Sequence, residues 1–154
     1  MKITDIKTCE ARFGYVRVYT DEGLYGTGEL SHQGAGWRAI VDSMKSILVG
    51  EDPRDVDMCF EKVRRAFIFR GAMSGHAVSA LTGIEVALWD LAGKAQGVPI
   101  YRLLGGKFRD RVRLYVDCAS GDYKETYQKV TDAGFTAMKF DLDDANRPEK
   151  VDRW

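Results

Sequence analysis

Cysteine is scarce in this 154-residue sequence, which holds only Cys9, Cys59 and Cys118. The three are odd in number and widely spaced, and no pair forms a C-x-x-C motif. That pattern argues against a disulfide framework and against a zinc knuckle. We interpret each cysteine as a packing residue with a free thiol, which predicts a reducing, cytoplasmic location.

An excess of one charge and a long apolar run are also missing. Lysine plus arginine and aspartate plus glutamate both number 23, so the formal net charge is +0. This balance leaves no electrostatic footprint for nucleic acid or an anionic membrane. No stretch approaches the roughly 18 apolar residues of a membrane span, and residues 1–5 do not lead into the apolar core of a signal peptide. We therefore expect no nucleic-acid partner and no membrane partner.

The clearest element that is present is a helix within Ser79–Gly106. Asp90 and Lys94 lie four residues apart with the acid first, which is the favourable order for a helical ion pair. Gly97 can end the helix, and Pro99 prevents its continuation. Apolar residues recur at spacings of three and four, at Ala77, Leu81, Ile84, Leu88, Leu91 and Ala95. By periodicity alone, this could be a buried helix of any α-rich domain.

A three-stranded antiparallel meander is predicted before this helix, over residues 2–10, 15–20 and 24–30. Gly26 and Gly28 weaken the third strand and predict a bulge or a close approach of another backbone. Two amphipathic helices follow, the first beginning at Trp37. In the second, Asp52 is the expected N-cap and Pro53 the first helical residue.

The pattern changes at residues 103–111, which we interpret as a domain joint. Val112, Leu114 and Val116 alternate with polar residues and predict a strand. A helix up to Gly134 and a strand over residues 135–140 follow. The short connections predict a βαβ unit with parallel strands and a right-handed crossover. Two parallel strands leave unpaired edges and uncovered faces, so this unit cannot stand alone.

Three segments resemble the enolase superfamily, in its mandelate racemase and muconate-lactonising branch. They are GIEVALWDLAGKAQGVPIYRLLGG (83–106), YTDEGLYGTGE (19–29) and GFTAMKFD (134–141), similar to the family's signature helix, capping hairpin and second barrel strand. The resemblance implies an α+β capping domain over residues 1–106, built of the three-stranded antiparallel meander plus helices. It implies that residues 107–154 form the first βαβ unit, and so the first two strands, of a (β/α) TIM-like barrel that is incomplete in this chain.

The candidate catalytic residues lie where that second barrel strand ends. Side chains alternate along a strand, so Lys139 and Asp141 share one face, while Met138 and Phe140 share the other. If the apolar pair packs on helices, the polar pair faces the barrel interior. The alternative is that Lys139 is a solvated lysine and that Asp141 begins a loop or forms an internal ion pair.

The resemblance assigns roles to these two residues. In lysine-bearing members of the family this strand ends in Lys-x-Lys, where the first lysine neutralises the substrate carboxylate and the second transfers a proton. Lys139 would keep the first role, and Asp141 stands where the usual base would be. This departure argues against two-base racemisation and lysine-based lactonisation, and it favours the acid-sugar dehydratases.

Two residues of the capping domain are candidates for substrate binding. The segment FIFRGAMSG (67–75) resembles the RGG loop of galactonate-type dehydratases, which would make Arg70 a contact for a carboxylate or hydroxyl. Alternatively, Arg70 is a charge that complements the dipole at a helix C-terminus. His32 lies in a loop that could reach the substrate, although a loop histidine is more often simply solvated.

The resemblance also implies a Mg²⁺ cofactor, whose ligands the family takes from the third, fourth and fifth barrel strands. We therefore assign no metal ligand in this chain. The predicted protein is a carbon–oxygen lyase that abstracts the proton α to the carboxylate of a small sugar acid, yielding a 2-keto-3-deoxy acid. Family members commonly self-associate, so we expect a homo-oligomer.

Alternatives remain open at this point. A racemase, epimerase or cycloisomerase of the same superfamily would share the fold and the cofactor. If the chain ends at Trp154, it could instead be a non-catalytic interaction module. The isolated 154-residue chain is expected to be inactive, because the barrel strands that would carry the metal are not in it.

Overall fold

The computed structural model describes residues 1–10, 13–30, 36–70, 74–118 and 123–140. The chain divides into two compact units, Met1–Lys107 and Phe108–Trp154. The first unit holds a mixed sheet-and-helix core, and the second holds a small parallel sheet with one helix. Among the described residues, no helix is both long enough and apolar enough to cross a membrane.

The first unit begins with the predicted antiparallel meander, which is confirmed. Strands β1 (Ile3–Glu10), β2 (Gly14–Thr20) and β3 (Tyr25–Glu29) lie in the order β1-β2-β3. The Thr20 amide donates to the carbonyl of Leu24 at 3.1 Å and closes the turn between β2 and β3, where Gly23 has a φ of 78°. Val16 and Val18 are buried on one face of the sheet, so alternation places the tyrosines and arginine of β2 on the other.

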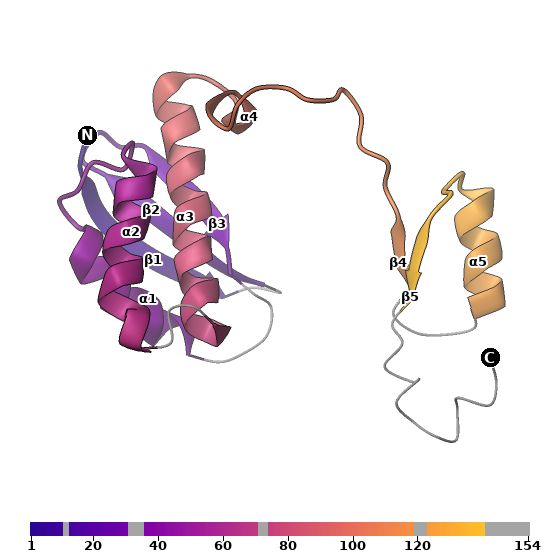
Figure 1. Cartoon of the computed structure of the whole chain (residues 1–154), viewed down its shortest axis with the longest axis horizontal. Coiled ribbons are helices and arrows are strands. Elements are labelled where there is room, and N and C mark those ends of the chain that lie inside the picture. Colours follow the sequence, from indigo (N-terminus) through magenta and orange to yellow (C-terminus); the bar gives the residue numbers. More distant parts are fainter. Residues whose placement is uncertain (11–12, 31–35, 71–73, 119–122, 141–154) are drawn as a thin grey trace. The chain divides into compact units, whose positions relative to one another are not determined.

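Helices α1 (Trp37–Leu48) and α3 (Gly75–Gln96) pack on the face of the sheet that carries the buried valines (Figure 1). Helix α2 (Val56–Phe67) packs against these two helices and continues into the 3-10 turn η1 (Ile68–Arg70). The short helix α4 (Ile100–Leu103) follows α3. Buried aliphatic residues from all three long helices and from the sheet form one continuous core.

The start of α2 differs from the prediction. Asp52 is not the N-cap, because α2 begins at Val56 after Asp55. The carboxylate of Asp52 instead accepts the Arg54 amide at 3.0 Å and the Arg54 Nε–H at 2.9 Å. This local turn uses the side-chain oxygens that would otherwise have capped a helix at Pro53.

Helix α3 lies unusually close to β3, because three glycines remove the side chains between them. A Cβ atom on Gly26 would overlap the carbonyl oxygen of Ala87, and one on Gly28 would overlap that of Gly83. A Cβ on Gly83 would in turn press on the side chain of Leu30. The close backbone approach predicted from the two strand glycines is confirmed.

The predicted ion pair of α3 is also confirmed, and it reaches the sheet. Lys94 Nζ lies 2.6 Å from Asp90 Oδ2. The same carboxylate oxygen accepts the backbone N–H of Thr27 at 2.8 Å, and Lys94 Nζ donates to the carbonyl of Tyr25 at 3.0 Å. Gly97, with a φ of 66°, ends the helix as predicted.

The second unit contains β4 (Val116–Cys118), α5 (Tyr123–Asp132) and β5 (Met138–Phe140). The two strands are parallel, as predicted, and pair Val116 with Met138 and Asp117 with Lys139. The predicted start of the first strand at Val112 is wrong, because residues 107–115 form no ladder and β4 begins only at Val116. Val112 and Leu114 are 67% and 64% exposed, so within the part of the chain described here no surface covers these two apolar side chains.

Candidate active site

The candidate site begins at the carboxyl ends of β4 and β5. Met138 lines a cavity together with Tyr127 and Thr131 of α5. Lys139 is the next residue, so the alternation of side chains along β5 places it on the face opposite to Met138. Its ammonium Nζ is 3.0 Å from Oδ2 of Asp117, the residue directly across the ladder.

Asp117 is the residue of this site that sequence reasoning missed. The predicted roles concerned Lys139 and Asp141 on a single strand, whereas the structure pairs Lys139 with an acid from the neighbouring strand. Both side chains are about half exposed, at 49% for Lys139 and 51% for Asp117. The sequence did hold a signal for this pair, because each predicted parallel strand carries a charged residue near its end.

Of the other three predicted site residues, only Arg70 lies in the described part of the chain. Asp141 and His32 lie outside the described residues, so their roles stay predictions. Arg70 is the last residue of η1 in the Met1–Lys107 unit and is exposed. Its guanidinium carbon lies 5.6 Å from the ring centroid of Phe67, a cation–π contact at the end of the helical segment.

Strongly perturbed pKa values lie elsewhere in the first unit. The hydrogen bond from Arg64, followed by that from Arg65, holds the pKa of Glu61 at about 2. Burial raises the pKa of the Cys59 thiol to about 11, which fits the packing role predicted for this cysteine. Both effects have local structural causes.

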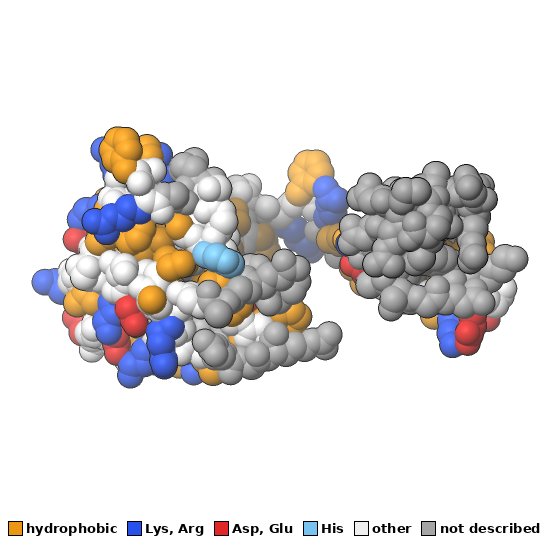
Figure 2. Space-filling model, turned by 90° about the horizontal axis from the view of Figure 1, so that it is seen from below, with side chains coloured by type: hydrophobic (Ala, Val, Ile, Leu, Met, Phe, Trp, Pro, Cys, Tyr) orange, Lys and Arg blue, Asp and Glu red, His pale blue; other side chains and the backbone are white. Residues whose placement is uncertain are grey.

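The described residues do not supply a metal centre. Within the parts of the chain that the structure describes, no three histidine, cysteine, aspartate or glutamate residues cluster so as to hold a metal ion. Mg²⁺ requires several hard oxygen ligands, and Asp117 is engaged in an ion pair with Lys139. Figure 2 shows basic and acidic side chains interspersed over one face of the first unit, without a single-sign patch on that face.

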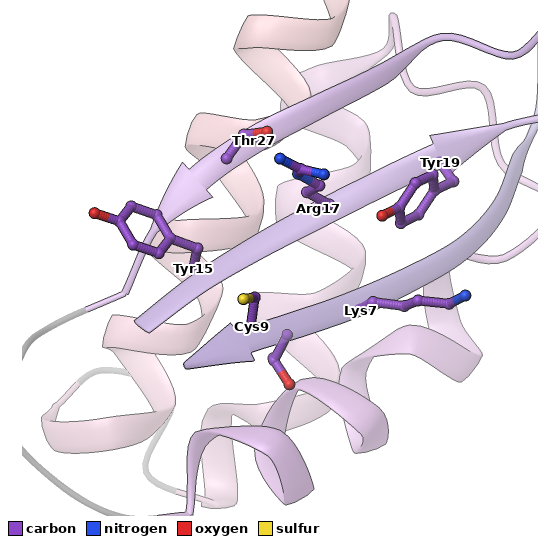
Figure 3. Close-up of a pocket in the computed structure, with 7 residues that line it drawn as sticks. Lys7, Cys9, Tyr15, Arg17, Tyr19 and Thr27 are labelled. Carbon is purple, nitrogen blue, oxygen red and sulfur yellow. The ribbon is translucent and has the colours of Figure 1, made fainter. Parts of the chain in front are cut away.

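A second concave region lies on the open face of the three-stranded sheet (Figure 3). Its volume is about 460 Å³, and Lys7, Cys9, Tyr15, Arg17, Tyr19 and Thr27 line it together with Thr8. Lys7 Nζ lies 5.6 Å from the ring centroid of Tyr19, and the guanidinium of Arg17 lies 4.9 Å from that of Tyr25. Arg70 and Lys139, the predicted site residues that the structure describes, do not line this region, so we do not assign it to the candidate active site.

Comparison with known proteins places these observations in a family context. The family model for the N-terminal domain of mandelate racemase and muconate lactonizing enzyme matches residues 1–105. D-xylonate dehydratase from Haloferax volcanii is 43% identical over an alignment of 160 positions, which covers 97% of this chain and 39% of that protein. D-galactonate dehydratase from Verminephrobacter eiseniae is 38% identical over 146 residues, which cover 90% of this chain and 38% of that protein. The chain thus spans about two fifths of the length of these curated relatives.

Solved structures show the same relationship. A mandelate racemase/muconate lactonizing enzyme-like protein from Rubrobacter xylanophilus superposes with a TM-score of 0.85 at 41% identity, over 96% of this chain and 43% of that one. A mandelate racemase/muconate lactonizing protein from Paracoccus denitrificans, solved in complex with magnesium, superposes with a TM-score of 0.76 at 25% identity. The match covers 90% of this chain and 41% of that one.

Proposed function

Since the chain belongs to the mandelate racemase/muconate lactonizing enzyme family of the enolase superfamily, we propose that it forms the N-terminal part of an acid-sugar dehydratase. The single observation that carries this proposal is the Lys139-Phe140-Asp141 sequence at the end of β5, with one lysine where two would serve racemisation. The D-xylonate and D-galactonate dehydratases to which the chain is similar support the same reaction class.

The reaction removes water from adjacent carbons of the sugar acid. The proton on the carbon next to the carboxylate goes to a base, and the hydroxyl on the following carbon leaves with a proton as water. The enol that remains tautomerises to a 2-keto-3-deoxy acid. Removal of the first proton places additional negative charge on the carboxylate, and this charge must be stabilised for the reaction to proceed.

Residues of this chain have proposed roles in binding and charge stabilisation. The ammonium of Lys139 binds the substrate carboxylate and opposes the charge that develops on it. Arg70 and His32 are the proposed contacts for the carboxylate or hydroxyls, and Asp141, which replaces the family's usual base, is the second candidate catalytic residue. The described residues do not fit a Mg²⁺ site, so the ligands of the proposed cation belong to other residues. When bound, such a cation would stabilise negative charge on the carboxylate.

The setting of the protein is part of the proposal. Free thiols at Cys9 and Cys59 suit a reducing cytoplasm. Self-association into a homo-oligomer is proposed from the family resemblance.

The test uses the whole protein that carries this chain, incubated with Mg²⁺ and a panel of sugar acids that includes D-xylonate and D-galactonate. We expect a keto acid to form and the activity to disappear with EDTA. The Lys139→Met variant should lower kcat/KM by at least about 10²-fold, the scale found when one charge-stabilising donor is lost. Exchange of the α-proton with D₂O without keto product would contradict dehydration and favour a racemase, epimerase or cycloisomerase. Absence of both reactions would favour an interaction module.

A further inference from the structure

The ion pair between Asp117 and Lys139 has a geometry that constrains one side chain in particular. The two residues are direct partners in the parallel ladder of β4 and β5, so their side chains lie on the same face. The Nζ–Oδ2 distance of 3.0 Å is that of a charge-assisted hydrogen bond. Lysine carries its charge on a flexible four-carbon stem, whereas the aspartate carboxylate is held close to the backbone. The aspartate is therefore one contact that holds the ammonium in place.

Within the described residues, stability of the fold does not account for this contact. Both side chains are about half exposed, and exposed ion pairs contribute little to folding free energy because water screens them. A negative charge beside a site for a carboxylate also opposes binding of that carboxylate. An acid at this position is thus unexpected if Lys139 only attracts an anion, and it is expected if the placement of the ammonium matters.

We infer that Asp117 is a positioning residue for Lys139 in the reaction of the sugar acid; this inference rests on the proposed function. An ammonium has three N–H donors, so it can bind Asp117 and a substrate carboxylate at the same time. An ammonium that is already oriented needs no reorganisation as charge develops on the carboxylate. Asp117 therefore acts on the rate of the chemical step, and its negative charge does not improve substrate binding.

The first experiment compares variants of the whole protein. Asp117→Ala should lower kcat about tenfold and leave KM within about twofold, a smaller effect than the roughly 10²-fold loss of a stabilising donor. The kcat of Asp117→Asn should lie between that of Asp117→Ala and that of the unaltered protein, because the asparagine amide oxygen still accepts a hydrogen bond. In a Lys139→Met background, Asp117→Ala should have no further effect, since the group that it positions is gone.

A matched control removes another exposed lysine–carboxylate pair of the same unit. Glu125 Oε1 lies 2.6 Å from Lys129 Nζ on α5, and both side chains are exposed. Glu125→Gln should leave kcat and KM unchanged. The inference is overturned if Asp117→Ala lowers kcat equally with and without Lys139, or if Glu125→Gln reproduces its effect, because either result would indicate a general structural defect.

A second readout does not depend on turnover. The lysine side-chain resonances of the protein, followed by NMR and assigned with Lys139→Met, should show the Lys139 signal shifted in Asp117→Ala. An unchanged Lys139 signal overturns the inference even in an active enzyme. If no sugar acid is turned over by the unaltered protein, the proposed function fails, while this spectrum still decides whether Asp117 holds Lys139.

Discussion

The backbone of Gly28 in β3 lies directly against the carbonyl of Gly83 in α3, with no room for a side chain between them. At this contact, the backbone of a strand and the backbone of a helix touch directly, with one residue contributed by each. It is repeated one helical turn further along, where Gly26 meets Ala87. Because backbone atoms cannot rotate away as a flexible side chain can, this contact fixes the distance between the sheet and its largest helix.

Gly28→Ala should therefore destabilise the capping unit strongly. The added methyl group would overlap the Gly83 carbonyl, and the helix would have to shift. We expect a loss of about 3 kcal/mol in the free energy of unfolding, at the upper end of overpacking effects. Urea unfolding followed by circular dichroism measures it. Thr27→Ser, on the open face of the same strand, is the control and should stay within about 0.5 kcal/mol; equal effects for both would contradict the packing argument.

Asp90→Ala should cost more than Lys94→Ala. The alanine at position 90 removes both the ion pair with Lys94 and the acceptor for the Thr27 amide. We expect a loss of about 1.5–3 kcal/mol, the scale for a hydrogen bond to a charged group. Lys94→Ala removes a more exposed partner and its bond to the Tyr25 carbonyl, both on the wet side of the contact, and should cost less, about 0.5–1 kcal/mol. Thermal unfolding of both variants shows which one loses more stability. A larger loss in Lys94→Ala would show that the Asp90 carboxylate is not the main contact between α3 and β3.

Glu61 should contribute to the acid sensitivity of the fold. Its pKa is lowered from 4.5 to about 2 by hydrogen bonds from Arg64 and Arg65. A depressed pKa means that the contribution is fully present above pH 4.5 and is lost as the pH falls toward 2. The unfolding free energy of Glu61→Gln should consequently depend less on pH across this window. Parallel curves for the variant and the unaltered protein would contradict this expectation.

Cys9 and Cys59 should differ sharply in reactivity. Cys59 is fully buried and its thiol pKa is raised to about 11, whereas Cys9 is exposed at the open face of the sheet. Because the thiolate is the reactive form, iodoacetamide at neutral pH should modify Cys9 in the folded protein and leave Cys59 intact. Peptide mass spectrometry gives the two extents. Equal modification before unfolding would argue against the burial of Cys59.

The sequence predicted those features that depend on local pattern. Alternation identified the meander, glycines in a strand indicated the close approach to α3, and the spacing of Asp90 and Lys94 indicated their ion pair. The prediction that Asp52 caps α2 was wrong, because an aspartate side chain can accept hydrogen bonds in a turn as well as at a helix N-terminus. The sequence also placed the first strand of the second unit too early at Val112, because alternation is compatible with an extended segment that has no hydrogen-bonded partner.

The pairing of Lys139 with Asp117 could not be predicted in the same way. Which residues face each other across two strands depends on the register, and three-residue strands carry too little pattern to fix it. The residues 22 positions apart become neighbours only through the βαβ arrangement. Asp141 was singled out by strand alternation and resemblance, and His32 by its place in a loop; both lie outside the described residues, so their roles stay predictions.

The contacts from α3 to β3 have a consequence for association. β3 is an outer strand of its sheet, and the N–H of Thr27 and carbonyl of Tyr25 are bound by Asp90 and Lys94. These are the groups with which an incoming strand from another molecule would form its first hydrogen bonds. The two helix side chains therefore obstruct edge-to-edge addition at β3, and with it one route to aggregation.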